Sequence, residues 1–239
     1  MSCMTYFVPG MRCLVFRWLL SLLVGGLVLQ FGASPVMAQD VPAIRIARVQ
    51  YQGGGDWYSD EESLTELMTF ARQQTLLDVG RQEETVKLTS DKVFSYPYLY
   101  LTGHGNVTFS SSEADRLRRY LLQGGFLHID DNYGLDEYIR EELKKVFPEK
   151  DLVELPFDHP IYHMQYDFPD GPPKIHEHDG ERPQGYALLD DDGRVMVYYT
   201  HEVDLGDGWD PASVHDNPPE KRQAALRMGV NILSYAMTH

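Results

Sequence analysis

Two apolar runs separated by a capped helix constrain the fold of this chain more than any other feature. Residues 98–102 (YLYLT) form a near-continuous apolar run, which predicts a strand buried on both faces. Ser110 and Glu113 have the spacing of a capping box, so a helix is expected to begin there. Residues 126–130 (FLHID) predict the next strand. A strand, a helix and a second strand in this order predict a parallel pair covered by the helix.

The same alternation continues along the chain. It predicts an α/β fold with a doubly wound, mostly parallel sheet. Asn217 is expected to cap the last helix and Pro218 to open it. The other expected elements are strands at 43–50, 86–88 and 152–155, a hairpin of 185–190 and 194–200, a helix after a Ser59–Glu62 capping box, and a helix at 136–147.

The first 38 residues have the pattern of a secretory signal peptide. Arg12 and Arg17 precede an apolar run at 18–31, and Val36-Met37-Ala38 resembles a cleavage site. The expected domain is then residues 39–239, exported to the periplasm or the outside of the cell. The alternative is an uncleaved membrane anchor, although a spanning helix needs roughly 20 apolar residues.

Charge and cysteine content exclude several classes of function. The formal net charge is −15, which repels nucleic acid and anionic lipid, so membrane contact is expected only through an uncleaved N-terminal segment. Cys3 and Cys13 both lie in the first 38 residues. The domain itself therefore lacks a disulfide framework, a cysteine zinc site and a cysteine nucleophile.

Three loops are expected at the carboxyl edge of the sheet, where open parallel sheets bind ligands. Each loop combines small residues with a polar group, which predicts a shared pocket for a small polar ligand. The alternative is that the glycines only form tight turns. The expected ligand-binding residues are Gly54, Gly55, Asp56, Trp57, Tyr58, Gly103, Gly105, Asn106, Asn132 and Tyr133.

A histidine-rich segment suggests a metal site. His176-Glu177-His178-Asp179 lies in a long proline-rich stretch, and in an extended chain His176 and His178 project to the same side. His104, Asp130 or Asp131 could complete a mixed nitrogen and oxygen set with them, which suits zinc or a similar divalent ion. The expected metal ligands are His104, His176, His178 and Asp179; the alternative is a polar surface loop.

Acid and base catalysis could use His104, Asp130, Asp131 or Glu177. Asp130 and Asp131 are adjacent, so they cannot both point into one site while the strand continues. The chain has no G-x-S-x-G elbow for serine catalysis. Asp204, Asp207 and Asp210 (DLGDGWD) do not have EF-hand spacing and are expected in a solvated turn; the alternative is a calcium site.

Several motifs together resemble a known superfamily. YLTGHG, the serine-capped helix and GGFLHIDDNYG resemble the class I glutamine amidotransferase-like superfamily and its trehalose-utilisation-protein-like members. With QGGGDWYSD, PKIHEHDG, DLGDGW and PPEKRQAALRMGVNILSYA, they resemble a bacterial family of exported or membrane-attached domains of unknown function. The resemblance implies a flavodoxin-like doubly wound sheet and a carbohydrate or polyol ligand. It does not imply amidotransfer, because Asp131-Asn132 stands where the superfamily has its nucleophilic cysteine.

Three functions remain open at this point. The first is an exported domain that binds a small polar ligand, such as a carbohydrate, at the carboxyl edge of the sheet. The second is a metal-dependent hydrolase at the same edge, with histidine and aspartate ligands. The third is a non-catalytic scaffold whose loops contact another envelope protein.

Overall fold

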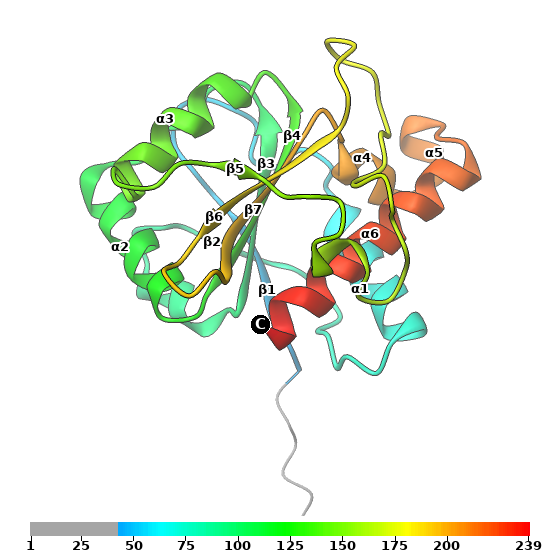
Figure 1. Ribbon diagram of the computed structural model, residues 1–239, viewed down its shortest axis with the longest axis horizontal. Helices are drawn as coiled ribbons and strands as arrows, with labels where there is room; N and C mark the ends of the chain where they lie inside the picture. The colour runs from blue at the N-terminus through cyan, green and yellow to red at the C-terminus, as the bar shows by residue number, and fades with distance from the viewer. Residues whose placement is uncertain (1–42) are drawn as a thin grey trace, which may run out of the picture. The chain divides into compact units, whose positions relative to one another are not determined.

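The computed structural model describes residues 43–239 as one sheet with helices along both of its faces (Figure 1). The predicted signal peptide and both cysteines lie outside these residues. The strands are β1 (Ile46–Val49), β2 (Glu84–Val86), β3 (Tyr98–His104), β4 (Phe126–Tyr133), β5 (Val153–Glu154), β6 (Gln184–Leu189) and β7 (Val195–His201).

Six α-helices and two short 3-10 helices connect the strands. No helix within residues 43–239 combines the length and the apolar character that crossing a membrane requires. The helices are α1 (Ser63–Gln74), η1 (Asp91–Ser95), α2 (Ser111–Leu122), α3 (Asp136–Val146), η2 (Pro160–Tyr162), α4 (Leu205–Trp209), α5 (Ala212–His215) and α6 (Pro219–Thr238).

The sheet confirms the predicted fold class. Its strand order is β2-β1-β3-β4-β7-β6-β5. Strands β2, β1, β3, β4 and β7 run parallel, whereas β6 pairs antiparallel with both β7 and β5. An order of 2-1-3-4 followed by one more parallel strand is that of flavodoxin-like, doubly wound sheets. The predicted hairpin is the antiparallel pair of β6 and β7.

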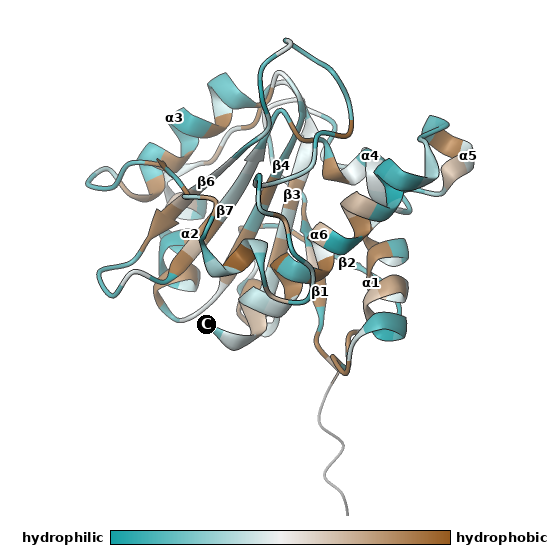
Figure 2. Cartoon of the chain, turned by 45° about the vertical axis from the view of Figure 1, so that its right-hand side comes forward, coloured by the Kyte–Doolittle hydropathy of each residue, from teal (hydrophilic) through white to brown (hydrophobic). Residues whose placement is uncertain are grey.

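Alternate residues of the central strands build two separate hydrophobic cores. In β3, Tyr98 and Tyr100 face the core shared with α1, α4 and α6, whereas Leu99 and Leu101 face the core shared with α2 and α3. Figure 2 shows the apolar strands between helices whose outer faces are polar. Because the sheet is covered on both faces, its parallel strands read as continuous apolar runs rather than as alternating ones.

The start of α2 is as predicted from the sequence, whereas the starts of α1 and α6 differ from the prediction. The Ser110–Glu113 capping box is present. Ser59 does not cap α1, because Arg48 donates hydrogen bonds to the carbonyl groups of Ser59 and Asp60 and holds this segment as a turn. Asn217 does not cap α6, since Pro218 is the N-cap and the Asn217 side chain turns toward His176.

Two strand boundaries also differ from the prediction. Strand β4 continues through Asp131 and Asn132 to Tyr133, so the turn comes at Gly134, which has a φ of 73°. Strand β2 ends at Val86 instead of beginning there. The longer β4 places Asp131 and Asn132 on a rigid strand, with their side chains on opposite faces of the sheet.

Candidate functional site

Two groups of polar side chains lie at the carboxyl edge of the sheet. The segment 170–183, yellow in Figure 1, rises above this edge; it supplies His176 to the first group and lines the cavity beside the second with His178, Asp179 and Glu181. We call the first group the aspartate–histidine cluster: Asp60, His176, Asp204, Asp207 and His215. We call the second group the cavity cluster: Asp131, Asp136, Arg140, Tyr199 and His201.

The aspartate–histidine cluster is built around α4. The backbone N–H of Gly206 donates a hydrogen bond to Asp130 Oδ2 at 2.7 Å, which fixes the start of this helix against β4. A Cβ at Gly208 would lie 2.4 Å from the Ala225 side chain, so only glycine lets α4 approach α6 this closely. The expectation of a solvated turn at residues 204–210 is therefore wrong: α4 is buried, because the glycines allow close packing.

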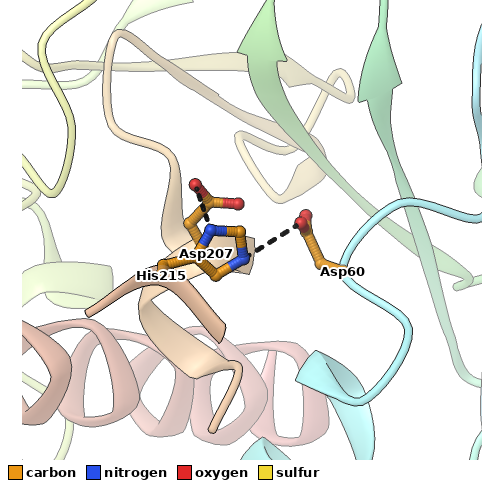
Figure 3. A group of neighbouring side chains, drawn as sticks. All are labelled: Asp60, Asp207 and His215. Atoms are coloured by element: carbon orange, nitrogen blue, oxygen red, sulfur yellow. Dashed lines mark ion pairs between the residues drawn. The ribbon is translucent and has the colours of Figure 1, made fainter. Parts of the chain in front are cut away.

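The imidazoles of this cluster converge on carboxylates. His176 Nδ1 lies 2.6 Å from Asp207 Oδ2 and 3.1 Å from Asp204 Oδ2. His178 Nε2 lies 3.1 Å from the same oxygen of Asp204. His215 stands between two carboxylates, with 3.3 Å to Asp207 and 3.9 Å to Asp60 (Figure 3). Segments far apart in the sequence thus meet at one point.

The carboxylates of this cluster are buried without a permanent positive charge beside them. Within residues 43–239, only histidines form ion pairs with Asp60, Asp204 and Asp207. Burial and the negative charges of Asp204 and Asp60 raise the pKa of Asp207 to about 10. Burial, followed by the charge of Asp204, raises the pKa of Asp130 to about 8. The hydrogen bond to Asp204 raises the pKa of His176.

The cavity cluster has similar residues, but its carboxylates have partners. Asp131 Oδ1 accepts the backbone N–H of Leu135 at 3.0 Å. The Tyr199 hydroxyl lies 3.2 Å from Asp131 Oδ2 and 2.8 Å from Asp136 Oδ1. Arg140 pairs with Asp136 at 2.8 Å. Burial raises the pKa of Asp136, but the hydrogen bonds from Arg140 and Tyr199 outweigh this and the net pKa is lowered.

A cavity of about 590 Å³ opens beside the cavity cluster. Tyr133 is half exposed at its rim, and its ring lies 5.3 Å from the ring of His178. His178 therefore links the cavity to Asp204. The lining is strongly acidic: six carboxylates surround the cavity, namely those of Asp131, Asp136, Glu137, Asp179, Glu181 and Glu202.

Within residues 43–239, three sets of residues have potential ligand atoms close enough together to hold a metal ion. In each set, one potential ligand atom per residue lies within 4.8 Å of the others. Two of the sets share Asp207 in the aspartate–histidine cluster, and the third belongs to the cavity cluster. The sets are Asp60, Asp207 and His215; His176, Asp204 and Asp207; and Asp131, Asp136 and His201.

The structure brings some of the predicted metal and catalytic residues together and separates others. His176 and His178 meet at Asp204, whereas His104 is exposed and pairs with Asp56 at 3.0 Å. Asp130 is fully buried below α4, and Asp131 lines the cavity. The Glu177 side chain is exposed and pairs with Lys174, while Asp179 lines the cavity. His104 and Glu177 thus belong to neither cluster.

The three glycine-containing loops do not surround one cavity. The first two loops pack against each other, with the N–H of Gly55 donating to the carbonyl of Asn106 at 2.9 Å. A Cβ at Gly55 would lie 2.7 Å from the carbonyl oxygen of His104, so the glycines allow close loop packing. Trp57 and Tyr58 line a separate cavity of about 320 Å³. Among the predicted ligand-binding residues, only Tyr133 lines the larger cavity.

Several residues of the two clusters were not predicted from the sequence. Asp204, Asp207 and Asp210 recur every three residues, which places them on one side of a helical turn, and this spacing was the available signal. Asn132 donates a hydrogen bond to Asp60 at 2.7 Å across the sheet edge. Asp60 precedes α1, His215 ends the short helix α5 and Asn217 lies just after it, and none of them belongs to a recognisable local pattern.

The fold and the site together define a doubly wound α/β protein with an imidazole- and carboxylate-rich edge. A family model described as a domain of unknown function (DUF4159) matches residues 45–237, and the chain belongs to this family. No curated protein matches the chain.

Proposed function

We propose that this domain binds a small polar ligand in the cavity at the carboxyl edge of the sheet. The observation that carries the proposal is the acidic cavity beside Tyr133, at the edge where doubly wound sheets bind ligands. Six carboxylates, one arginine and two histidines line it, so a phosphate or carboxylate ligand would be repelled. The ligand is therefore uncharged or positively charged.

A carbohydrate or an amino sugar fits this chemistry. Tyr133 and Tyr186 offer aromatic faces, and the carboxylates around them accept hydrogen bonds from hydroxyl and ammonium groups. Arg140 stacks on the Tyr186 ring at 4.6 Å and keeps this wall ordered. The strand order supports a relation to the class I glutamine amidotransferase-like superfamily, without its cysteine chemistry.

We also propose that the domain works outside the cytoplasm. The support is the sequence of residues 1–38, with its two arginines, apolar run and small residues before Gln39. Mass spectrometry of the N-terminus of the mature protein tests this. A mature chain that begins at Gln39 supports export, and one that begins at Met1 or Met11 contradicts cleavage.

Metal-dependent hydrolysis is a second candidate function. The observation that favours it is His178, which lies in the cavity wall and also contacts Asp204 of the aspartate–histidine cluster. A hydrolysed bond held in the cavity would lie next to this cluster. Release of a chromophore from nitrophenyl glycosides and esters by the zinc-loaded protein would support this function. No release with any of them would count against it.

The binding proposal is tested by calorimetry with glucose, trehalose, glucosamine and glucose 6-phosphate. We expect at least one of the first three to bind and the phosphate not to bind. Tyr133→Ala should weaken binding by about tenfold or more, because it removes a stacking face. Tyr58→Ala is the matched control, since Tyr58 is also an exposed tyrosine but lines the other cavity. No binding of the three sugars, or equal losses in both variants, would contradict the proposal.

A further inference from the structure

In the aspartate–histidine cluster, a histidine nitrogen and two carboxylate oxygens lie close together, and a neutral histidine places no N–H group between them. Asn217 Nδ2 donates to the backbone carbonyl of Asp207 at 3.0 Å, which fixes the orientation of the amide. Asn217 Oδ1 therefore faces His176 Nε2 at 3.0 Å and accepts a hydrogen bond from the Nε2–H group. With the proton on Nε2, the neutral ring of His176 has a lone pair on Nδ1.

That lone pair faces Asp204 Oδ2, and an oxygen of Asp207 lies close beside it. His176 Nδ1 lies 2.6 Å from Asp207 Oδ2 and 3.1 Å from Asp204 Oδ2. Three acceptor atoms at these distances repel one another unless a proton or a cation stands between them. They are satisfied by a second proton on His176, by a proton on Asp207, whose pKa is raised by burial, or by a bound cation.

An independent observation concerns Asp204. This residue is 2% exposed, and its Oδ1 accepts no hydrogen bond from the described residues. Its other oxygen already faces His176 and His178. A buried carboxylate oxygen without a donor is costly, and coordination of a metal ion would satisfy it.

We infer that a divalent transition-metal ion binds in this cluster, with His176 Nδ1, Asp204 and Asp207 as its ligands. One imidazole nitrogen with two carboxylates suits zinc or manganese better than calcium, which prefers oxygen ligands alone. Zinc binds such ligands at about 2.0–2.2 Å. His176 Nδ1 lies 2.6–3.1 Å from the two carboxylate oxygens, so these side chains need to move apart only slightly to hold the ion between them.

The surrounding residues take supporting roles. Asn217 orients the ring of His176, as outer-shell partners of metal-bound histidines do. His178 contacts Asp204 and stands at the cavity, so it connects the ion with the ligand cavity. His215 contacts the same oxygen of Asp207 as His176 does, and it lies between Asp207 and Asp60 (Figure 3). The inference does not depend on whether the cavity binds a ligand.

Calorimetry of the chelator-treated full chain with zinc chloride, manganese chloride and calcium chloride tests this site. We expect zinc or manganese to bind with about one equivalent and calcium to bind at least tenfold more weakly. His176→Ala and Asp207→Asn should each weaken binding by more than about 100-fold, beyond the loss typical of outer-shell changes. Asp207→Asn keeps the shape of the side chain and removes a buried charge, so it retains the fold.

Two matched controls separate this site from other histidines. His104→Ala and His201→Ala should bind the metal within about threefold of the wild type, since one lies at Asp56 and the other in the cavity cluster. The inference is overturned if the wild type binds neither zinc nor manganese, if calcium binds equally well, or if the control variants lose as much affinity as His176→Ala and Asp207→Asn.

Discussion

The cavity cluster and the aspartate–histidine cluster lie at the same edge of the sheet and are joined through His178, yet only the cavity cluster contains an arginine. Arg140 and the Tyr199 hydroxyl satisfy Asp136, and the N–H of Leu135 satisfies Asp131. Among the described residues, the aspartates of the other cluster form ion pairs only with imidazoles, and Asp60 also accepts a hydrogen bond from Asn132. Similar residues thus produce one self-contained group and one group that requires an added positive charge.

This difference gives the two clusters different expected roles. A satisfied, half-open cluster can present fixed hydrogen-bonding groups to a ligand without rearrangement. A buried cluster with an unsatisfied oxygen is costly when empty and becomes stable when a cation enters. The predictions below test this division, beginning with the largest expected effect.

The stability of the metal-free protein should fall as pH rises. The pKa of Asp130 is about 8 and that of Asp207 about 10 in the folded chain, against about 3.8 when unfolded. Between pH 4 and 8 the folded state therefore binds more protons than the unfolded state, and its stability decreases with pH. The raised pKa of His176 acts in the same direction.

Without metal, we expect the free energy of unfolding, measured in urea, to fall by about 3 kcal/mol between pH 5 and pH 8. This value is smaller than the full effect of the two pKa shifts, because solvent screens part of it. Saturating zinc should reduce or reverse this trend, because metal binding displaces protons from its ligands. A metal-free protein that becomes more stable from pH 5 to pH 8 would contradict the charge account of the aspartate–histidine cluster.

Amide replacements should have opposite signs in the two clusters. Asp207→Asn removes a carboxyl group that must take up a proton when the chain folds at pH 8, so it should stabilise the metal-free protein at that pH by about 1–2 kcal/mol. Asp136→Asn removes the partner of Arg140 and should destabilise it by about 1 kcal/mol. Chemical unfolding at pH 8 measures both variants. Two changes of the same sign would remove the distinction between the clusters.

A substitution at Asn217 tests whether this residue caps a helix or orients His176. Serine is as good a helix cap as asparagine, so a capping residue would tolerate Asn217→Ser. Serine cannot both donate to the Asp207 carbonyl and reach His176 Nε2, so we expect about tenfold weaker zinc binding. Calorimetry gives the affinity, and an unchanged value would show that Asn217 does not orient His176.

Arg140→Ala should make the cavity cluster resemble the aspartate–histidine cluster, because its carboxylates would then lack an arginine partner. Without the guanidinium, Asp136 loses its positive partner, and we expect a second, weak zinc equivalent together with a loss of about 1 kcal/mol in stability. The second equivalent should disappear in the Arg140→Ala, His201→Ala double variant. Zinc titration that stays at one equivalent would mean that the arginine does not decide where cations bind.

The sequence predicted the sheet well and the site only in part. Buried strands such as 98–104 have continuous apolar patterns, and Ser110 with Glu113 forms a local cap, so short-range physics identifies them. Residues 204–210 have the glycine content of a turn, but contacts with Asp130 and Ala225 make them a buried helix. Such tertiary contacts override local propensity.

The same limit applies to the histidines. His176 and His178 were found because their spacing is local, whereas His215 and Asp60 join them only through the fold. His104 looked equivalent from its sequence neighbours, but the N–H and ring of this residue face Asp56. Which histidines share a centre depends on loop packing that no local pattern contains.

The most direct test of the account is anomalous X-ray scattering from crystals of the protein soaked in zinc chloride. The account predicts a strong peak at about 2.0–2.2 Å from His176 Nδ1 and from oxygens of Asp204 and Asp207. A peak found only between Asp131, Asp136 and His201, or no peak at either cluster, would contradict it.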